Sequence, residues 1–102
     1  MEILIIVIIV VGIIAFVAIN NASYAFSNNN ALTDITMKSV EYIGSSAFEN
    51  CQNLTTVVFP NIEYIDYEAF KDCSSLTSLT LSNCVSEIGS DAFNGCDSLK
   101  YL

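Results

Sequence analysis

The same pattern occurs three times along the chain: IGSSAFENCQNLTTV from Ile43, IDYEAFKDCSSLTSL from Ile65 and IGSDAFNGCDSLKYL from Ile88. Each copy begins with Ile and has Ala-Phe at offsets four and five, Cys at offset eight, Leu at offset eleven and another apolar residue at offset fourteen. The copies start 22 and 23 residues apart. A repeat of this length predicts a solenoid, in which each unit buries its apolar face against its neighbours.

A degraded fourth copy precedes these three. It keeps an Ala-Phe pair, Ala25-Phe26, whereas Asn21 replaces the leading Ile and Asn29 replaces the Cys. The predicted repeats therefore span 21–42 (degraded), 43–64, 65–87 and 88–102 (incomplete), after a separate segment at 1–20. The single extra residue of the third interval falls in the connection Asn83-Cys84-Val85, where an insertion costs little.

Two parts of the repeat carry a family resemblance. The strand part reads Leu54-Thr-Thr-Val57-Val-Phe59-Pro60, and the turn part reads Ile43-Gly44-Ser-Ser-Ala47-Phe48-Glu-Asn-Cys51. These residues resemble the BspA-like leucine-rich repeats, which are common in large surface-antigen families of bacteria and some protists. The resemblance implies an α/β repeat solenoid with a parallel sheet on one wall and short helical turns on the other. It also implies that the sheet is the usual ligand surface.

Alternation within each strand separates a buried face from an outward face. The apolar positions of each strand and the Ala-Phe pairs of the turns are expected to form the core. The outward positions give a narrow stripe that we predict as the binding face: Asp34, Thr36, Thr56, Val58, Ser78, Thr80 and Tyr101. Such residues also suit any solvent-facing strand, since Thr has a high strand propensity.

The amino-terminal segment is different in kind. Residues Ile3 to Ile19 are seventeen consecutive residues without a polar side chain, and a helix of that length nearly spans a bilayer core of ~30 Å. This favours one transmembrane helix that anchors the chain. A cleaved signal peptide is the alternative, but Met1-Glu2 supplies no basic residue. Cleavage after the best triplet, Ser23-Tyr24-Ala25, would split the first Ala-Phe pair.

The repeats are expected outside the cell. They resemble a surface family, they are acidic, and they carry the sequons Asn21-Ala-Ser and Asn53-Leu-Thr. If the amino-terminal segment were cleaved, the protein would instead be secreted.

Composition excludes several functions. Eleven acidic residues against three basic ones give a net charge of −8, which disfavours a nucleic-acid partner. The chain has no His, so the most usual general base is missing. No phosphate-binding loop is present, and Asp66, Glu68 and Asp72 lack the spacing of a calcium loop. We therefore expect neither an enzyme nor a cofactor or metal.

Four cysteines allow two interpretations. Cys51, Cys73 and Cys96 share one repeat offset, whereas Cys84 lies in the insertion. Free Cys commonly fills a small apolar space in a core, and we prefer this interpretation to disulfides. A tetrahedral zinc site would need a fourth ligand. Cys84 is expected to be the most exposed.

The sequence thus predicts a membrane-anchored, surface-displayed repeat protein for contact with a protein or host-surface ligand. One alternative is a pilin-like filament subunit, because Glu2 followed by a long apolar run resembles the amino-terminal helix of mature type IV pilins. Another is a fragment of a longer surface antigen. Because the sequence stops at Leu102 inside a strand motif, self-association through an uncapped carboxy-terminal coil is also expected.

Overall fold

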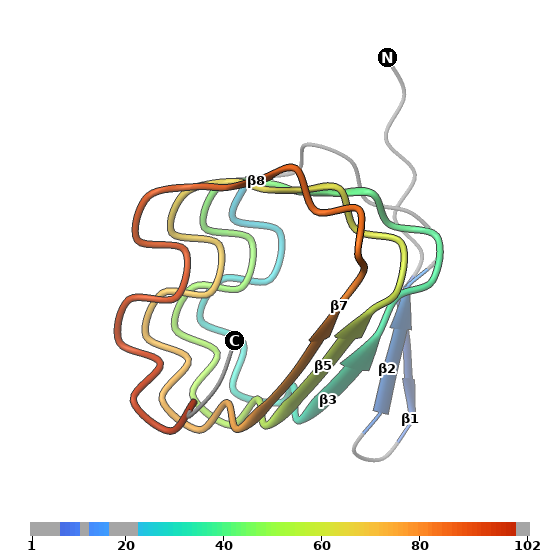
Figure 1. Ribbon diagram of the computed structural model, residues 1–102. Helices are drawn as coiled ribbons and strands as arrows, with labels where there is room; N and C mark the ends of the chain where they lie inside the picture. Colours follow the sequence, from blue (N-terminus) through green and yellow to red (C-terminus); the bar gives the residue numbers. More distant parts are fainter. Residues whose placement is uncertain (1–6, 11–12, 17–22, 100–102) are drawn as a thin grey trace.

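The computed structural model describes residues 7–10, 13–16 and 23–99. In it, successive coils of the chain stack on one another to form a solenoid (Figure 1). One wall is a sheet of five strands in the order β1-β2-β3-β5-β7. Its strands are β1 (Val7–Val10), β2 (Ile13–Phe16), β3 (Asp34–Thr36), β5 (Thr56–Phe59) and β7 (Ser78–Leu81). A second wall is a three-stranded sheet of β4 (Tyr42–Ile43), β6 (Tyr64–Ile65) and β8 (Glu87–Ile88). Zigzag turns form the wall opposite the larger sheet (Figure 1).

Strand register follows the repeat period. Ile35 lies beside Val57 and Val57 beside Leu79 in parallel strands, which is a step of 22 residues. In the smaller sheet Tyr64 lies beside Glu87, a step of 23 residues. The extra residue therefore falls between β7 and β8, as the sequence predicts.

The core is the one expected from the repeat. Strand, turn and connecting residues meet in one buried cluster, and its largest fully buried side chains are Phe48, Phe59, Phe70, Leu32, Ile35, Met37, Ile43, Leu54, Ile62, Ile65 and Leu76. The Phe rings of successive turns stack at centroid separations of 5.3, 5.1 and 5.4 Å. Burial decreases toward the last coil, where Leu79, Leu81 and Phe93 are only partly covered.

The expected helical turns are a wrong prediction for the described residues, which contain no helix. Two residues of each turn have left-handed φ angles, for example Ser46 (φ 56°) and Asn50 (φ 62°), and a right-handed helix cannot pass through them. The turn amides instead donate across to the next coil, as Phe48 N does to the Ala69 carbonyl at 2.8 Å. Backbone groups are thus satisfied between coils and not within a helix.

The described parts of the apolar segment are also strands and not the expected helix. β1 and β2 form an antiparallel pair in which Val7 lies opposite Phe16. β2 then pairs in parallel with β3, with Ile14 beside Ile35, and so takes the strand position of the first coil. The remaining residues of Ile3–Ile19 lie outside the described residues. Within the described part of the chain, no helix is long and apolar enough to cross a bilayer.

Candidate functional site

The predicted binding face lies on the outer side of the larger sheet. Register aligns its residues in two rows: Asp34, Thr56 and Ser78 in one, and Thr36, Val58 and Thr80 in the other. The rows alternate with buried positions such as Ile35 and Val57. Tyr101 lies outside the described residues. The stripe is therefore continuous over three strands of the sheet.

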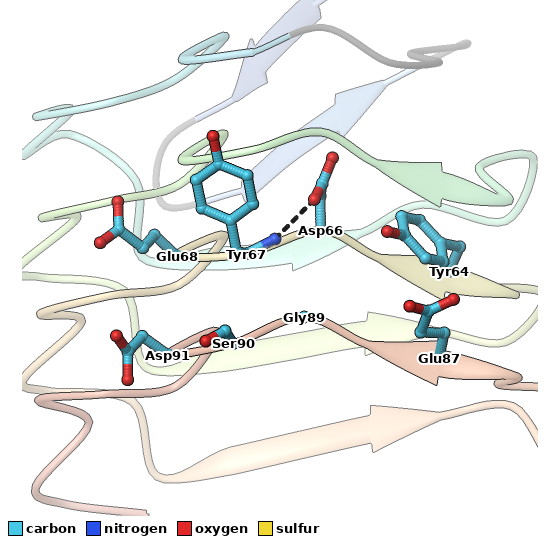
Figure 2. A pocket seen from close by; sticks show the side chains of 8 residues that line it. All are labelled: Tyr64, Asp66, Tyr67, Glu68, Glu87, Gly89, Ser90 and Asp91. Carbon is cyan, nitrogen blue, oxygen red and sulfur yellow. Dashed lines mark hydrogen bonds between the residues drawn. The ribbon is translucent and has the colours of Figure 1, made fainter.

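A second surface is hollowed. Between the third and fourth turns a shallow cavity of about 450 Å³ opens beside the smaller sheet (Figure 2). Its lining residues come from two neighbouring coils: Tyr64, Asp66, Tyr67, Glu68, Glu87, Gly89, Ser90 and Asp91. A Cβ at Gly89 would lie 2.4 Å from the Tyr67 backbone nitrogen, so only glycine allows the two coils to approach this closely.

Two carboxylates of the cavity have partners within the protein. Asp66 accepts hydrogen bonds from the Tyr42 hydroxyl and from the Tyr67 amide, both at 2.8 Å. Glu68 pairs with Lys71 at 3.4 Å, the only ion pair among the described residues. Glu87 and Asp91 lie on the next coil, where the described part of the chain offers no cation to pair with them. Among the described residues, the charges of Glu87 and Asp91 are therefore not compensated.

Tyrosine rings form the wall next to these carboxylates. Tyr42 and Tyr64 stack with ring centroids 4.7 Å apart. Burial and the hydrogen bond to Asp66 raise the pKa of Tyr42 to about 12. Burial, followed by the charges of Asp66 and Glu87, also raises the pKa of Tyr64. Both rings are thus neutral at physiological pH and offer apolar faces beside the anionic groups.

The arrangement does not suit a metal ion. Among the described residues, no three side chains of the types His, Cys, Asp and Glu come together in a group that could hold one. Asp66 and Glu68, which the sequence places in the densest acidic stretch, do line the cavity, whereas Asp72 does not. The sequence alone did not identify Glu87 and Asp91 as their neighbours, because those residues follow one repeat later.

The cysteines form a ladder and not a disulfide. All four are free thiols, and only Cys84 is exposed, as predicted. Each of the buried thiols donates to the carbonyl of the Phe in the preceding turn: Cys51 to Phe26 at 3.2 Å, Cys73 to Phe48 at 3.1 Å and Cys96 to Phe70 at 3.1 Å. Hydrogen bonding with the flanking thiols of Cys51 and Cys96, together with burial, raises the pKa of Cys73. The middle thiol is therefore a poor nucleophile and fills a structural position.

Comparison with known proteins agrees with this geometry. A leucine-rich repeat protein from Bacteroides ovatus, known from a crystal structure, superposes with a TM-score of 0.72 at 33% sequence identity over 76% of this chain and 21% of its own. The T. pallidum leucine-rich repeat protein has the same fold, with a TM-score of 0.63 at 22% identity over 86% of this chain and 62% of its own. The chain thus spans about a fifth of the B. ovatus protein. No curated protein matches it.

A family model covers most of the chain and assigns it to a family. The model for the BspA type leucine rich repeat region, in six copies, matches residues 19–102. This range includes all four turns and every strand from β3 to β8. The chain belongs to the BspA-type leucine-rich repeat family.

Proposed function

We propose that this chain is a non-catalytic, surface-displayed binding module that contacts a cationic segment of another protein. The observation that carries the proposal is the cavity in which Glu87 and Asp91 face Tyr64 and Tyr67 without a compensating cation among the described residues. A Lys or Arg side chain could approach the carboxylates while its stem or guanidinium packs on a ring. The net charge of −8 would attract such a partner from a distance.

The outward stripe is the second candidate surface, and one experiment separates the two. The probe is an immobilised decalysine peptide, and binding of the full chain is measured by surface plasmon resonance at several salt concentrations. Glu87→Gln with Asp91→Asn should weaken binding by up to about tenfold, since both side chains are exposed and each exposed ion pair contributes roughly 0–1 kcal/mol. Thr36→Glu with Thr80→Glu should leave binding unchanged or slightly stronger.

A matched control distinguishes the cavity from overall charge. Glu41→Gln with Asp97→Asn also removes two negative charges at exposed positions, but neither residue lines the cavity. Equal loss of binding in this control and in the cavity variant would mean that only net charge matters, and the proposal would fail.

Membrane anchoring through Ile3–Ile19 is the second part of the proposal. Its support is the unbroken apolar run of seventeen residues, which approaches the length needed to cross ~30 Å of hydrocarbon as a helix. External display is supported by the acidic composition and by the exposed Asn53 of a sequon.

Fractionation with a carbonate wash tests the anchor. Intact protein should stay with the membranes, and a reagent that cannot enter cells should label Lys38 and Lys71 on intact cells. Recovery of the intact chain in the soluble fraction would contradict anchoring. A mature amino terminus near Phe26 would indicate a cleaved signal peptide instead.

A further inference from the structure

The aromatic column of the smaller sheet is followed by a carboxylate. Tyr42 and Tyr64 are register partners in β4 and β6, and their rings stack with centroids 4.7 Å apart. Glu87 is the register partner of Tyr64 in β8. The position that carries a ring in two successive coils therefore carries a carboxylate in the coil that follows them.

The two faces of the Tyr64 ring have different surroundings. Because β6 lies between β4 and β8, Tyr42 stacks on one face of Tyr64 and the second face is turned toward Glu87. Figure 2 shows the Glu87 side chain extending from its strand toward Tyr64. Within residues 23–99 no ring stacks on this second face, and both residues line the cavity. The second face of Tyr64 is thus open to a ligand that enters the cavity.

The second face of Tyr64 and the Glu87 carboxylate are both electronegative. The face of an aromatic ring carries the negative part of its quadrupole, so it attracts a cation and does not attract a carboxylate. Burial, and then the charges of Asp66 and Glu87, raise the pKa of Tyr64, so the carboxylate and the ring interact electrostatically. A cation placed between the two groups would be attracted by both.

Asp66, the other carboxylate beside the rings, already has partners for both of its oxygens. Its Oδ2 accepts from the Tyr42 hydroxyl and its Oδ1 from the Tyr67 amide, both at 2.8 Å. These bonds fix Asp66 and hold the Tyr42 ring against Tyr64. Glu87 is exposed, and no described cation pairs with it. Glu87 is therefore the carboxylate that remains to bind a partner at this end of the cavity.

We propose that Tyr64 and Glu87 bind an arginine side chain of the partner protein and prefer it to lysine. The planar guanidinium would stack on the second face of Tyr64, as the third plane of the Tyr42–Tyr64 column, while two of its N–H groups donate to the Glu87 carboxylate. A guanidinium can do both because its donors lie in the plane of the group, whereas an ammonium is a compact, strongly hydrated charge. This inference names the partner chemistry of the proposed function and rests on it.

The test compares decaarginine with decalysine. Both peptides are immobilised at equal density, and binding of the full chain is measured by surface plasmon resonance at one salt concentration. The ratio of the two dissociation constants is the readout, because the attraction due to net charge is common to both peptides. The unaltered chain should bind decaarginine about two- to fivefold more tightly, as expected for a stacked and forked contact that lysine does not make.

Matched substitutions locate the preference. Tyr64→Leu removes the ring and should bring the ratio toward one, whereas Tyr64→Phe keeps the face and should preserve the ratio. Glu87→Gln should also bring the ratio toward one. Asp91→Asn removes an equal charge at the opposite end of the cavity (Figure 2) and should weaken binding of both peptides without changing the ratio.

Circular dichroism of each variant verifies that the sheets are retained. Glu87 is exposed, so Glu87→Gln still decides the matter if Tyr64→Leu does not fold.

The outcomes separate this inference from the proposed function. Equal binding of the two peptides by the unaltered chain would overturn the arginine preference, as would a folded Tyr64→Leu or Glu87→Gln variant with an unchanged ratio. In either case, a larger effect of the Glu87 and Asp91 pair than of the Glu41 and Asp97 control would still support the proposed function. Equal effects of these two pairs would remove the proposed function, and the arginine preference with it.

Discussion

The central ring of the Phe stack offers the sharpest test of the solenoid core. Phe70 has no exposed surface. Its ring lies between Phe48, at a centroid distance of 5.1 Å, and Phe93, at 5.4 Å, and it also contacts Phe59 at 5.9 Å. Replacement by Ala removes apolar burial and leaves a cavity bounded by three other rings. Neighbouring coils on both sides limit the relaxation that could fill it.

The magnitude follows from these contacts. A buried Phe→Ala substitution costs about 3–5 kcal/mol, and a site bounded by three rings belongs at the upper end because aromatic pairs add roughly 0.5–1.5 kcal/mol beyond burial. The free energy of unfolding of a domain this size is about 5–15 kcal/mol. With a urea slope of roughly 1–3 kcal/mol/M, Phe70→Ala should lower the midpoint by about 2 M or leave the chain unfolded.

Urea unfolding of the full chain, followed by far-ultraviolet circular dichroism, provides the measurement. Phe93→Ala should cost roughly half as much, since Phe93 is only partly buried and stacks on Phe70 alone among the described residues. Glu68→Ala breaks a half-exposed ion pair and should cost about 0–1 kcal/mol. An unchanged midpoint for Phe70→Ala, or a larger loss for Phe93→Ala than for Phe70→Ala, would refute the assigned packing.

Three further predictions concern single groups. Ser46→Gly should stabilise the chain by about 1 kcal/mol in the same assay, because Ser46 has a φ of 56° and a buried hydroxyl without a partner among the described residues; Ser46→Ala should gain less. In the native chain a thiol reagent should modify Cys84 alone, and urea should expose the three buried thiols; rapid native labelling of Cys84→Ser would contradict the ladder. The folded pKa of Tyr42 is raised to about 12 from about 10 unfolded, so its contribution to stability is complete below pH 10 and is lost between pH 10 and 12; Tyr42→Phe should flatten the pH dependence of the urea midpoint in this window.

The stack could be predicted because three copies share one register. Ala47, Phe48 and Cys51 recur at fixed offsets in the next two copies, and all three are buried. Periodic burial of this kind can be read from sequence, since it depends only on which positions are apolar. The same periodicity fixed the strand pairs and the place of the inserted residue.

The turn conformation was predicted wrongly, although part of the signal was present. One left-handed position of each turn is occupied by residue types that favour it: Asn28, Asn50, Asp72 and Gly95. The other is occupied by Tyr24, Ser46, Glu68 and Asp91, which give no common signal. The hydrogen bonds from the turn amides to the next coil explain why the second position keeps a left-handed φ angle. These bonds form only when the coils stack, so the sequence of a single turn does not reveal them.

The cavity was predicted only on one of its two sides. Asp66 and Glu68 are close in sequence, but their neighbours Glu87 and Asp91 follow about one repeat later. Their meeting depends on the 23-residue step and on the approach allowed by Gly89. The sequence alone therefore does not show which side chains of neighbouring coils meet at the cavity.

In the apolar segment Ile3–Ile19, periodicity does not distinguish a helix from strands. An unbroken run of Val and Ile suits a membrane helix by length, and it suits buried strands equally by composition. What separates the two is the partner, which here is the edge of β3. The same residues would therefore serve either as strands paired to β3 or as a helix inserted in a membrane.

Insertion of Ile3–Ile19 into a membrane would withdraw both β1 and β2 from the sheet. The edge of β3 that pairs with Ile14 and Ala15 would then have no strand beside it. The two states therefore exclude each other, because a chain in which Ile3–Ile19 spans a membrane cannot hold β1 and β2 in the sheet.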